Sequence, residues 1–244
     1  SPEIFMKELL SAGFAKIFQI CRCFRAAERG RRHLPEFSML EWYAAGQSYS
    51  DLMHTCEALL EQIRTDLSLP AACTWQGHTI QTTPPWPRLR VAEAFSRFGG
   101  QSMEGALAQG AFDEIMGLSI EPQLGLSRPV FLCDYPAETA LLAHPKPQEP
   151  ELAQRFELYM AGLEICNGCT ELADAKLQQK RLEAELERRS KAALPLTPPP
   201  ARFLKALETM PEAAGCALGI DRLVMLLTDS AEIDEVVPFP PEPP

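Results

Sequence analysis

An arginine-rich loop between two apolar stretches constrains the fold of this chain more than any other feature. Residues Lys16 to Phe24 (KIFQICRCF) are rich in β-branched, aromatic and sulfur side chains, as are Met39 to Tyr43, so both are predicted to be strands. The loop between them carries Arg25, Arg29, Arg31, Arg32 and His33. Because each guanidinium presents a planar fork of N–H donors, such a loop is suited to binding a polyphosphate. An ordinary solvated basic loop is the alternative.

A second stretch far along the chain, Gly215 to Leu227 (GCALGIDRLVMLL), indicates another anion site. Its small residues predict a closely packed strand, and the apolar residues from Ile220 onward have helical spacing. Arg222 would then lie in the first turn of the helix, where backbone N–H groups and the helix dipole favour anions. The chain therefore has two candidate phosphate-binding arginines at distant positions.

The segment Phe156 to Glu171 is the best candidate for a metal site. A two-residue turn at Ala161-Gly162 predicts that Tyr159 pairs with Glu164 and that Glu157 pairs with Cys166, with Glu157 and Glu164 on one face. Two converging carboxylates suit Mg²⁺ that is also bound to nucleotide phosphates. Two ordinary glutamates on an exposed sheet are the alternative.

The cysteines give only a weak zinc signal. Cys166 and Cys169 have Cys-x-x-Cys spacing, and Cys21 and Cys23 offer two more thiols. A structural zinc site needs four ligands at fixed spacing, and strand residues lack the turn-like geometry, so these cysteines are interpreted as apolar filling.

Composition favours a single domain over residues 1–244, since 46% of 244 residues are hydrophobic. We expect a helix from Ser50 to Leu67, a small helical insertion at about 91–125, a charged helix from Asp174 to Ala193 and a proline-rich tail at 238–244. The sequence has no membrane span or signal peptide, and eight cysteines without such a signal indicate reduced thiols, so a cytoplasmic location is expected. A net charge of −10 excludes a broad basic surface for nucleic acid.

Four segments together resemble the lysyl branch of the class II aminoacyl-tRNA synthetases. FRxxE…RRHLPEF…LEWY and GCALGIDRLVMLL resemble the family's motifs 2 and 3, and SPEIFMKELLSAGF and FELYMAGLEICNGCTEL resemble other lysyl-branch segments. The resemblance covers nearly the whole chain. It implies an α+β fold with a mainly antiparallel sheet flanked by helices, adenylate formation from ATP with Mg²⁺, and a homodimer. It also leads us to expect that the N-terminal part of the domain, with motif 1, is missing.

The resemblance assigns roles to individual residues. Arg25 would hold the α-phosphate and Arg222 the γ-phosphate, with His33 near the phosphate tail and Phe37 stacked on adenine. Further nucleotide contacts would come from Ala26, Ala27, Glu164, Ile165 and Gly219. The amino acid would be surrounded by Ser1, Pro2, Glu3, Tyr43, Asn167 and Glu171, and a buried carboxylate such as Glu171 suits the ε-ammonium of lysine.

Three positions depart from the family. It usually reads Arg-Asn-Glu where this chain has Arg25-Ala26-Ala27, and asparagine where it has Leu34. The missing Glu would accept from the adenine amino group, so we expect adenine recognition to weaken unless Glu28 substitutes for it.

Two activities and one binding role fit the lysyl branch. The first is ligation of a lysine-type amino acid to a lysine of elongation factor P, as in a synthetase paralogue. It is favoured by the short link ALPLTPPPARFLKALETMP, by Ala217 where tRNA enzymes usually carry glycine, and by the short 101–125 insertion. The second is the catalytic core of a lysyl-tRNA synthetase, with tRNA as the acceptor. The third is a synthetase-like module that binds without catalysis.

Overall fold

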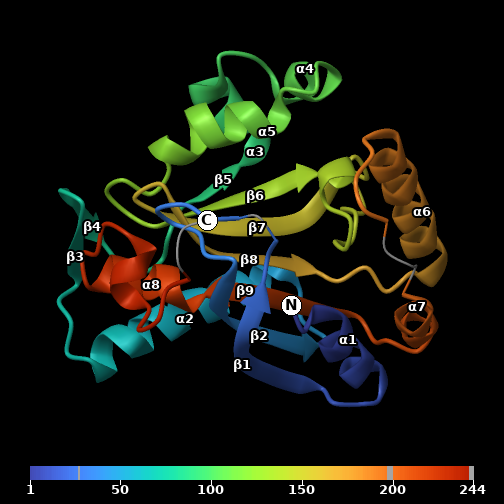
Figure 1. Cartoon of the computed structure of the whole chain (residues 1–244), viewed down its shortest axis with the longest axis horizontal. Helices are drawn as coiled ribbons and strands as arrows, with labels where there is room; N and C mark the ends of the chain where they lie inside the picture. The colour runs from blue at the N-terminus through green and yellow to red at the C-terminus, as the bar shows by residue number, and fades with distance from the viewer. Residues whose placement is uncertain (27, 197–199, 242–244) are drawn as a thin grey trace.

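A seven-stranded sheet organises the molecule (Figure 1). The computed structural model describes residues 1–26, 28–196 and 200–241. The strands follow one another across the sheet as β1 (Lys16–Phe24), β2 (Glu36–Ala45), β9 (Ala213–Gly219), β8 (Leu163–Thr170), β7 (Leu152–Met160), β6 (Val130–Pro136) and β5 (Arg88–Arg90). Only β5 and β6 run parallel; every other neighbouring pair in this sheet is antiparallel. The predicted α+β fold with a mainly antiparallel sheet is confirmed.

The arginine-rich loop connects β1 and β2, as predicted. The ladder runs from Lys16 paired with Ala44 to Phe24 paired with Glu36, and Arg25 N donates to Pro35 O just beyond it. Strand β2 therefore begins at Glu36, three residues before the predicted Met39. The extra pairs place Phe37 on the strand and not in the loop.

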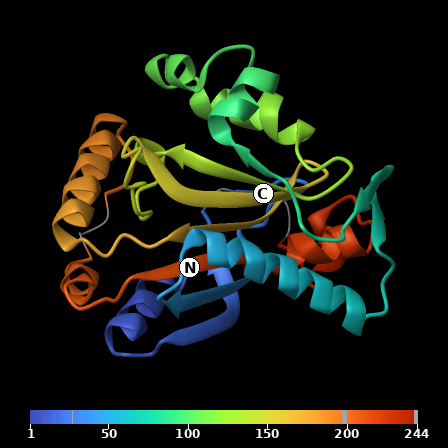
Figure 2. The ribbon, with the colours of Figure 1, turned by 180° about the vertical axis from the view of Figure 1, so that it is seen from behind.

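Helix α2 (Tyr49–Asp66) packs across one face of β8 and β9 and is seen best from behind (Figure 2). Its cap is Ser48, not the predicted Ser50: Ser48 N and Oγ both donate to the Asp51 carboxylate at 2.8 Å. Leu52, Met53 and Cys56 of this helix are buried in the main core against the sheet. The opposite face of these strands remains open at the centre of the molecule.

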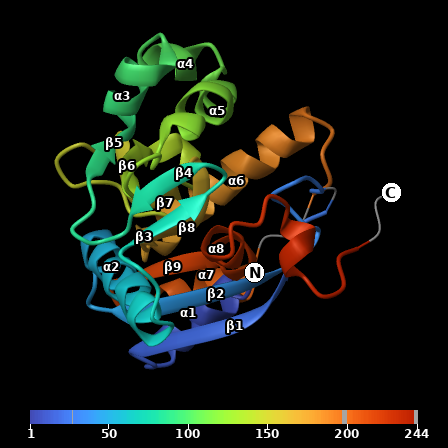
Figure 3. The same ribbon diagram turned by 90° about the vertical axis from the view of Figure 1, so that its left-hand side faces the viewer.

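Helix α8 (Ile220–Leu227) follows β9 directly, with Arg222 in its first turn as predicted. The small hairpin of β3 (Ala72–Trp75) and β4 (His78–Gln81) lies beside it at one end of the main sheet (Figure 3). A 3-10 turn at Ile233–Val236 then packs back on α8.

Residues 91–123 form a group of short helices at the β5–β6 edge. They are α3 (Val91–Ala94), α4 (Met103–Ala108), α5 (Phe112–Ile115), π-helical turns at Phe95–Gly99 and Met116–Ile120, and a 3-10 turn at Glu121–Gln123. The group has its own core, in which the rings of Phe95 and Phe112 stack with centroids 5.0 Å apart. It lies away from the centre of the open face.

The remaining helices lie at the other end of the sheet. They are α1 (Glu3–Ser11), α6 (Ala175–Lys191) and α7 (Ala201–Leu207), with a further 3-10 turn at Ala137–Thr139. Asp174 caps α6 by accepting from two backbone N–H groups. Of the predicted proline-rich tail, residues 242–244 lie outside the described part of the chain. Within the described residues, no helix has the length and apolar character needed to cross a membrane.

Candidate active site

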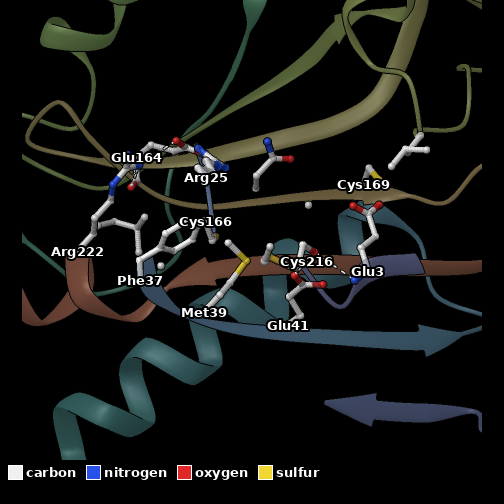
Figure 4. A pocket seen from close by; sticks show the side chains of 18 of the residues that line it. Glu3, Arg25, Phe37, Met39, Glu41, Glu164, Cys166, Cys169, Cys216 and Arg222 are labelled. Carbon is white, nitrogen blue, oxygen red and sulfur yellow. Dashed lines mark hydrogen bonds and ion pairs between the residues drawn. The ribbon is translucent and has the colours of Figure 1, made fainter. Parts of the chain in front are cut away.

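A pocket of about 410 Å³ opens on the face of the sheet opposite α2 (Figure 4). Its floor follows from strand register: Glu41 of β2, Ala217 of β9 and Asn167 of β8 form one row across three strands. Tyr43, Gly215 and Cys169 form the next row. A Cβ atom on Gly215 would collide with the Tyr43 ring and the Glu171 carboxylate. Glycine at this position therefore lets side chains from β2 and β8 meet above β9.

One end of the pocket is acidic. Glu3, Glu41 and Glu171 line it, and one ammonium group, that of Lys7, bridges two of them at 2.7 Å from Glu3 Oε1 and 2.6 Å from Glu171 Oε2. Glu41 has hydroxyl partners only: Ser1 Oγ donates to it at 2.6 Å and Tyr43 Oη at 2.8 Å. Because Lys7 pairs with only two of the three carboxylates, this end of the pocket is suited to binding a further amine.

Burial dominates the ionisation of these groups. It raises the pKa of Glu171 to about 7, with the Lys7 charge opposing the rise and the Glu3 charge adding to it. Burial also raises the pKa of Glu41, and the hydrogen bonds from Ser1 and Tyr43 offset this rise only in part. For Lys7, burial acts to lower the pKa, but the charges of Glu171 and Glu3 outweigh it and raise the pKa above its usual value.

Lys7 and Glu41 were missed by the sequence analysis. The Glu3–Lys7 contact has i,i+4 spacing on α1, a pattern that a helical reading of SPEIFMKELL could have detected. Glu41 lies two residues before Tyr43, on the same face of β2, so the predicted strand already implied its position. Pro2, by contrast, does not line the pocket and starts helix α1 as its N-cap residue.

The other end of the pocket carries arginines. Arg222 Nη1 donates to the Glu164 carboxylate and to its backbone oxygen, both at 3.0 Å, and Arg222 Nη2 lies 2.5 Å from His33 Nε2. Burial, and then the charge of Arg222, lower the pKa of His33, so the neutral imidazole accepts this hydrogen bond. Gly219 caps α8, and a Cβ at this position would lie 3.7 Å from the Arg222 side chain, an ordinary contact distance.

Arg25 lies over the ring of Phe37, with its guanidinium carbon 5.5 Å from the ring centroid, and pairs with Glu28 at 3.3 Å. Arg25 is more than half exposed, and both Arg25 and Phe37 line the pocket. Ala26 is exposed outside the pocket, and Ala27 lies outside the described residues.

The four loop arginines separate into two pairs with different surroundings. Arg29 forms two hydrogen bonds with Asp234, at 2.8 and 2.6 Å, and Arg31 pairs with Glu232 at 3.2 Å. These contacts attach the loop to the segment after α8. Only Arg25 and Arg32 of the four line the pocket.

Glu157 and Glu164 lie on one face of the β7–β8 hairpin, but the register of β7 against β8 differs from the predicted one. Tyr159 pairs with Glu164 as predicted, but a bulge at Ile165 makes Glu157 pair with Asn167, not with Cys166. The Ile165 side chain enters the core, while Asn167 Nδ2 donates to Glu157 at 3.0 Å. A two-residue turn alone fixes register only next to the turn, so the bulge could not be predicted.

The two glutamates differ in accessibility. Glu164 is about one-third exposed and lines the pocket. Glu157 is buried and bonded to Arg155 and to the hydroxyls of Tyr135 and Tyr159. Burial, followed by the charge of Glu164, raises the pKa of Glu157. Two carboxylates that repel one another fit a hard cation between them, with Glu164 as the accessible ligand.

Comparison with known proteins gives a consistent result. The chain matches, over residues 1–243, the family described as tRNA synthetases class II (D, K and N). It is 36% identical to a lysine–tRNA ligase of Nostoc over 98% of this chain and 46% of that relative. It is 39% identical to an elongation factor P–(R)-beta-lysine ligase of Haemophilus influenzae, over 98% of this chain and 75% of the relative. A ligase of the same name from Erwinia tasmaniensis is 37% identical, again over 75% of its length. The chain thus spans about half the length of the tRNA ligase and three quarters of the others.

Proposed function

Since the chain belongs to the class II tRNA synthetases of the D, K and N group, we propose that it is a ligase that activates a lysine-type amino acid with ATP. The observation that carries the proposal is the polarity of the pocket. Three carboxylates stand at one end and Arg25, Arg32 and Arg222 at the other. A molecule with amines at one end and a polyphosphate at the other would be complementary to it.

At the acidic end, Glu41 and Glu171 recognise the ammonium groups of the amino acid. Glu41 forms no ion pair among the described residues, and the N-terminal ammonium acts on it only as a nearby charge, so a substrate ammonium would be its direct ionic partner. Glu171 already holds Lys7, which fixes its carboxylate in place. Tyr43 Oη, held by Glu41, and Ser1 define the wall between these groups.

At the basic end, Arg25 and Arg222 hold the triphosphate so that the carboxylate of the amino acid lies in line with the α-phosphorus. That carboxylate attacks, the bond to the β-phosphate oxygen breaks, and pyrophosphate leaves toward Arg222. The acyl group then passes to an acceptor amine or hydroxyl and AMP is released. Fixed guanidinium groups favour this step by positioning the reactants and stabilising charge. His33, neutral and bonded to Arg222, orients that arginine.

Mg²⁺ would be held by Glu164, with Glu157 behind it, and would neutralise phosphate charge during the displacement. Glu157 reaches this site only by loosening its bonds to Arg155 and Asn167. The hydroxyls of Tyr135 and Tyr159 both donate to Glu157 Oε2 and hold this carboxylate in place.

We propose elongation factor P as the acceptor, with the amino group of one of its lysines receiving the acyl group. The support is the slightly higher identity with the named elongation factor P ligases, 39% and 37% against 36% for the lysine–tRNA ligase of Nostoc. The acidic net charge of −10 also disfavours a long nucleic acid acceptor. Transfer to tRNA is the second candidate, since the lysine–tRNA ligases are nearly as similar in sequence. A homodimer and a cytoplasmic location remain part of the proposal.

Transfer of labelled lysine and of labelled (R)-β-lysine to purified elongation factor P and to lysine tRNA tests the acceptor. We expect label on the protein, dependent on ATP and lost when the acceptor lysine of the factor is replaced by arginine. Label on tRNA alone would assign the second candidate and overturn the first.

A further inference from the structure

Three cysteines from separate segments meet beneath the floor of the pocket. Cys56 comes from α2, Cys166 from β8 and Cys216 from β9, and their sulfur atoms all lie within 4.8 Å of one another. Cys56 Sγ and Cys166 Sγ are 3.7 Å apart. Each residue is at most 2% exposed, and none forms a disulfide.

Strand register explains why the thiols converge. Cys166 pairs with Leu218, two residues from Cys216, so both cysteines point to the same face of adjacent strands, toward α2. The direct partner of Cys216 is Gly168, whose missing side chain makes room for the Phe156 ring; a Cβ there would lie 2.7 Å from that ring and 3.2 Å from the Cys216 Cβ. Cys56 closes the triangle from the helix. Cys169 belongs to the other face, near Glu171, which is why the Cys-x-x-Cys spacing forms no site.

The spacing of the sulfur atoms is that of three ligands on one ion. Thiolates bonded at about 2.3 Å to a common ion lie about 4 Å apart in a planar arrangement and about 3.5 Å apart in a pyramidal one, the geometry of an ion that keeps a lone pair. The observed separations, 3.7 Å for Cys56 and Cys166 and within 4.8 Å for the whole group, contract to the pyramidal value with shifts of about 1 Å. Among the described residues, no fourth His, Cys, Asp or Glu belongs to the group, so a four-coordinate zinc site is not formed.

The apolar surroundings of the three thiols favour an ion whose charge the three thiolates neutralise. The three thiols belong to a core cluster of apolar side chains that includes Leu52, Met53 and Leu218. Three thiolates on a divalent ion would carry a net negative charge into this core, at a large desolvation cost. Three thiolates on a trivalent ion form a neutral complex.

We propose that Cys56, Cys166 and Cys216 form a binding site for a trivalent thiophilic ion of the arsenic and antimony class. With arsenious acid, three arsenic–oxygen bonds break and three arsenic–sulfur bonds form. Each thiol proton leaves with a hydroxide as water, so no oxidant or reductant is needed. Cys166 and Cys216 are also among the residues around the pocket (Figure 4), with their thiols on the α2 side of its floor. Binding would tie α2 to the two strands that carry Asn167 and Ala217.

Arsenite added to the folded chain tests the site. Cys21 and Cys23, whose sulfur atoms are 4.0 Å apart on β1, form a competing dithiol, so the parent for this test is Cys21→Ala. We expect one arsenic retained per chain after gel filtration, three sulfur neighbours by X-ray absorption spectroscopy, and a higher Tm. Two sulfur neighbours, or a lower Tm from binding to the unfolded chain, would overturn the proposal.

Single substitutions locate the ion independently. Cys56→Ala, Cys166→Ala and Cys216→Ala should each weaken arsenite binding at least tenfold, with circular dichroism reporting that the chain remains folded. Cys133→Ala is the matched control, since Cys133 is buried in the same core but outside the group, and it should bind as the parent does. Equal binding by all four variants would contradict the assignment, as would displacement of arsenite by equimolar Zn²⁺.

Discussion

Arg222, which we propose as a phosphate-binding residue, also connects separate parts of the structure. The sequence placed it in an exposed first turn, free to meet a ligand. The structure leaves its side chain 17% exposed and gives it bonds to Glu164, His33 and the backbone of Arg32. These bonds join α8 to the β7–β8 hairpin and to the arginine-rich loop. Such long-range partners could not be inferred from a helix pattern, which specifies only local neighbours.

Replacing Arg222 with lysine should therefore reduce pyrophosphate exchange by a factor on the order of 10²–10³. Lysine keeps the charge but lacks the planar fork that reaches Glu164 and a phosphate together. Steady-state exchange rates measure the loss, and Arg202→Lys, on the exposed side of α7, serves as the control. Unchanged exchange in the Arg222 variant would remove this residue from the site.

Glu171 gives the pocket a pH dependence. Its pKa of about 7 means that the carboxyl gains a proton as the pH falls from 8 to 6, and the neutral form attracts an ammonium poorly. Lysine should therefore bind up to about tenfold more weakly at pH 6 than at pH 8. Calorimetric titration across this range measures the effect, and Glu171→Gln should bind more weakly and give a shallower profile. Equal or tighter binding at pH 6 would show that Glu171 is ionised throughout.

Ala27 allows a direct test of the nucleotide site. The family residue at this position is a glutamate that accepts from the adenine amino group, so Ala27→Glu should raise the preference for ATP over GTP by at least about tenfold. Competition of each nucleotide in the exchange assay gives the ratio, with Ala27→Leu as the control that adds bulk without an acceptor. If the parent already rejects GTP, backbone groups near Ile165 or Glu28 recognise adenine in its place.

At the scale of elements, the loop between β1 and β2 is attached to the C-terminal segment. Arg29 and Arg31 pair with Asp234 and Glu232, and Leu34 is 1% exposed among Met225, Ile233 and Val237. This apolar packing explains why leucine, and not the asparagine usual in the family, stands at position 34. Local patterns identified the strands and the loop. Its attachment depends on contacts some 200 residues away in sequence, which no periodicity reveals.

Leu34→Asn should therefore destabilise the chain, although asparagine is the usual family residue. The substitution removes apolar contacts and places an amide in an apolar cluster, at a cost of about 2–4 kcal/mol in the free energy of unfolding. Denaturant unfolding measures it. Arg31→Ala, which removes a surface ion pair of the same loop, should change stability by less than about 1 kcal/mol. Equal stabilities for Leu34→Asn and the parent would mean that the loop is held by its ion pairs.

At the scale of the whole molecule, the sheet brings segments from the N-terminus, the middle and the C-terminus to one pocket. The hairpins β1–β2 and β7–β8 follow from apolar strands and turns that the sequence shows plainly, whereas the position of β9 between β2 and β8 joins segments that no local pattern connects. The opposite polarity of the two pocket ends was predictable only in part. The arginines and Glu171 were identified from motifs, whereas Lys7 and Glu41 acquire their importance from burial, which depends on the assembled structure.

Amino-acid-dependent exchange of pyrophosphate into ATP directly tests whether the chain activates a lysine-type amino acid. We expect exchange that requires Mg²⁺ and is stimulated by lysine or (R)-β-lysine. We expect no stimulation by norleucine, which lacks the ε-ammonium proposed to bind at the acidic end of the pocket. Absence of exchange with either lysine isomer, in a folded chain that still binds the amino acid, would contradict the proposed ligase activity and assign a binding role without catalysis.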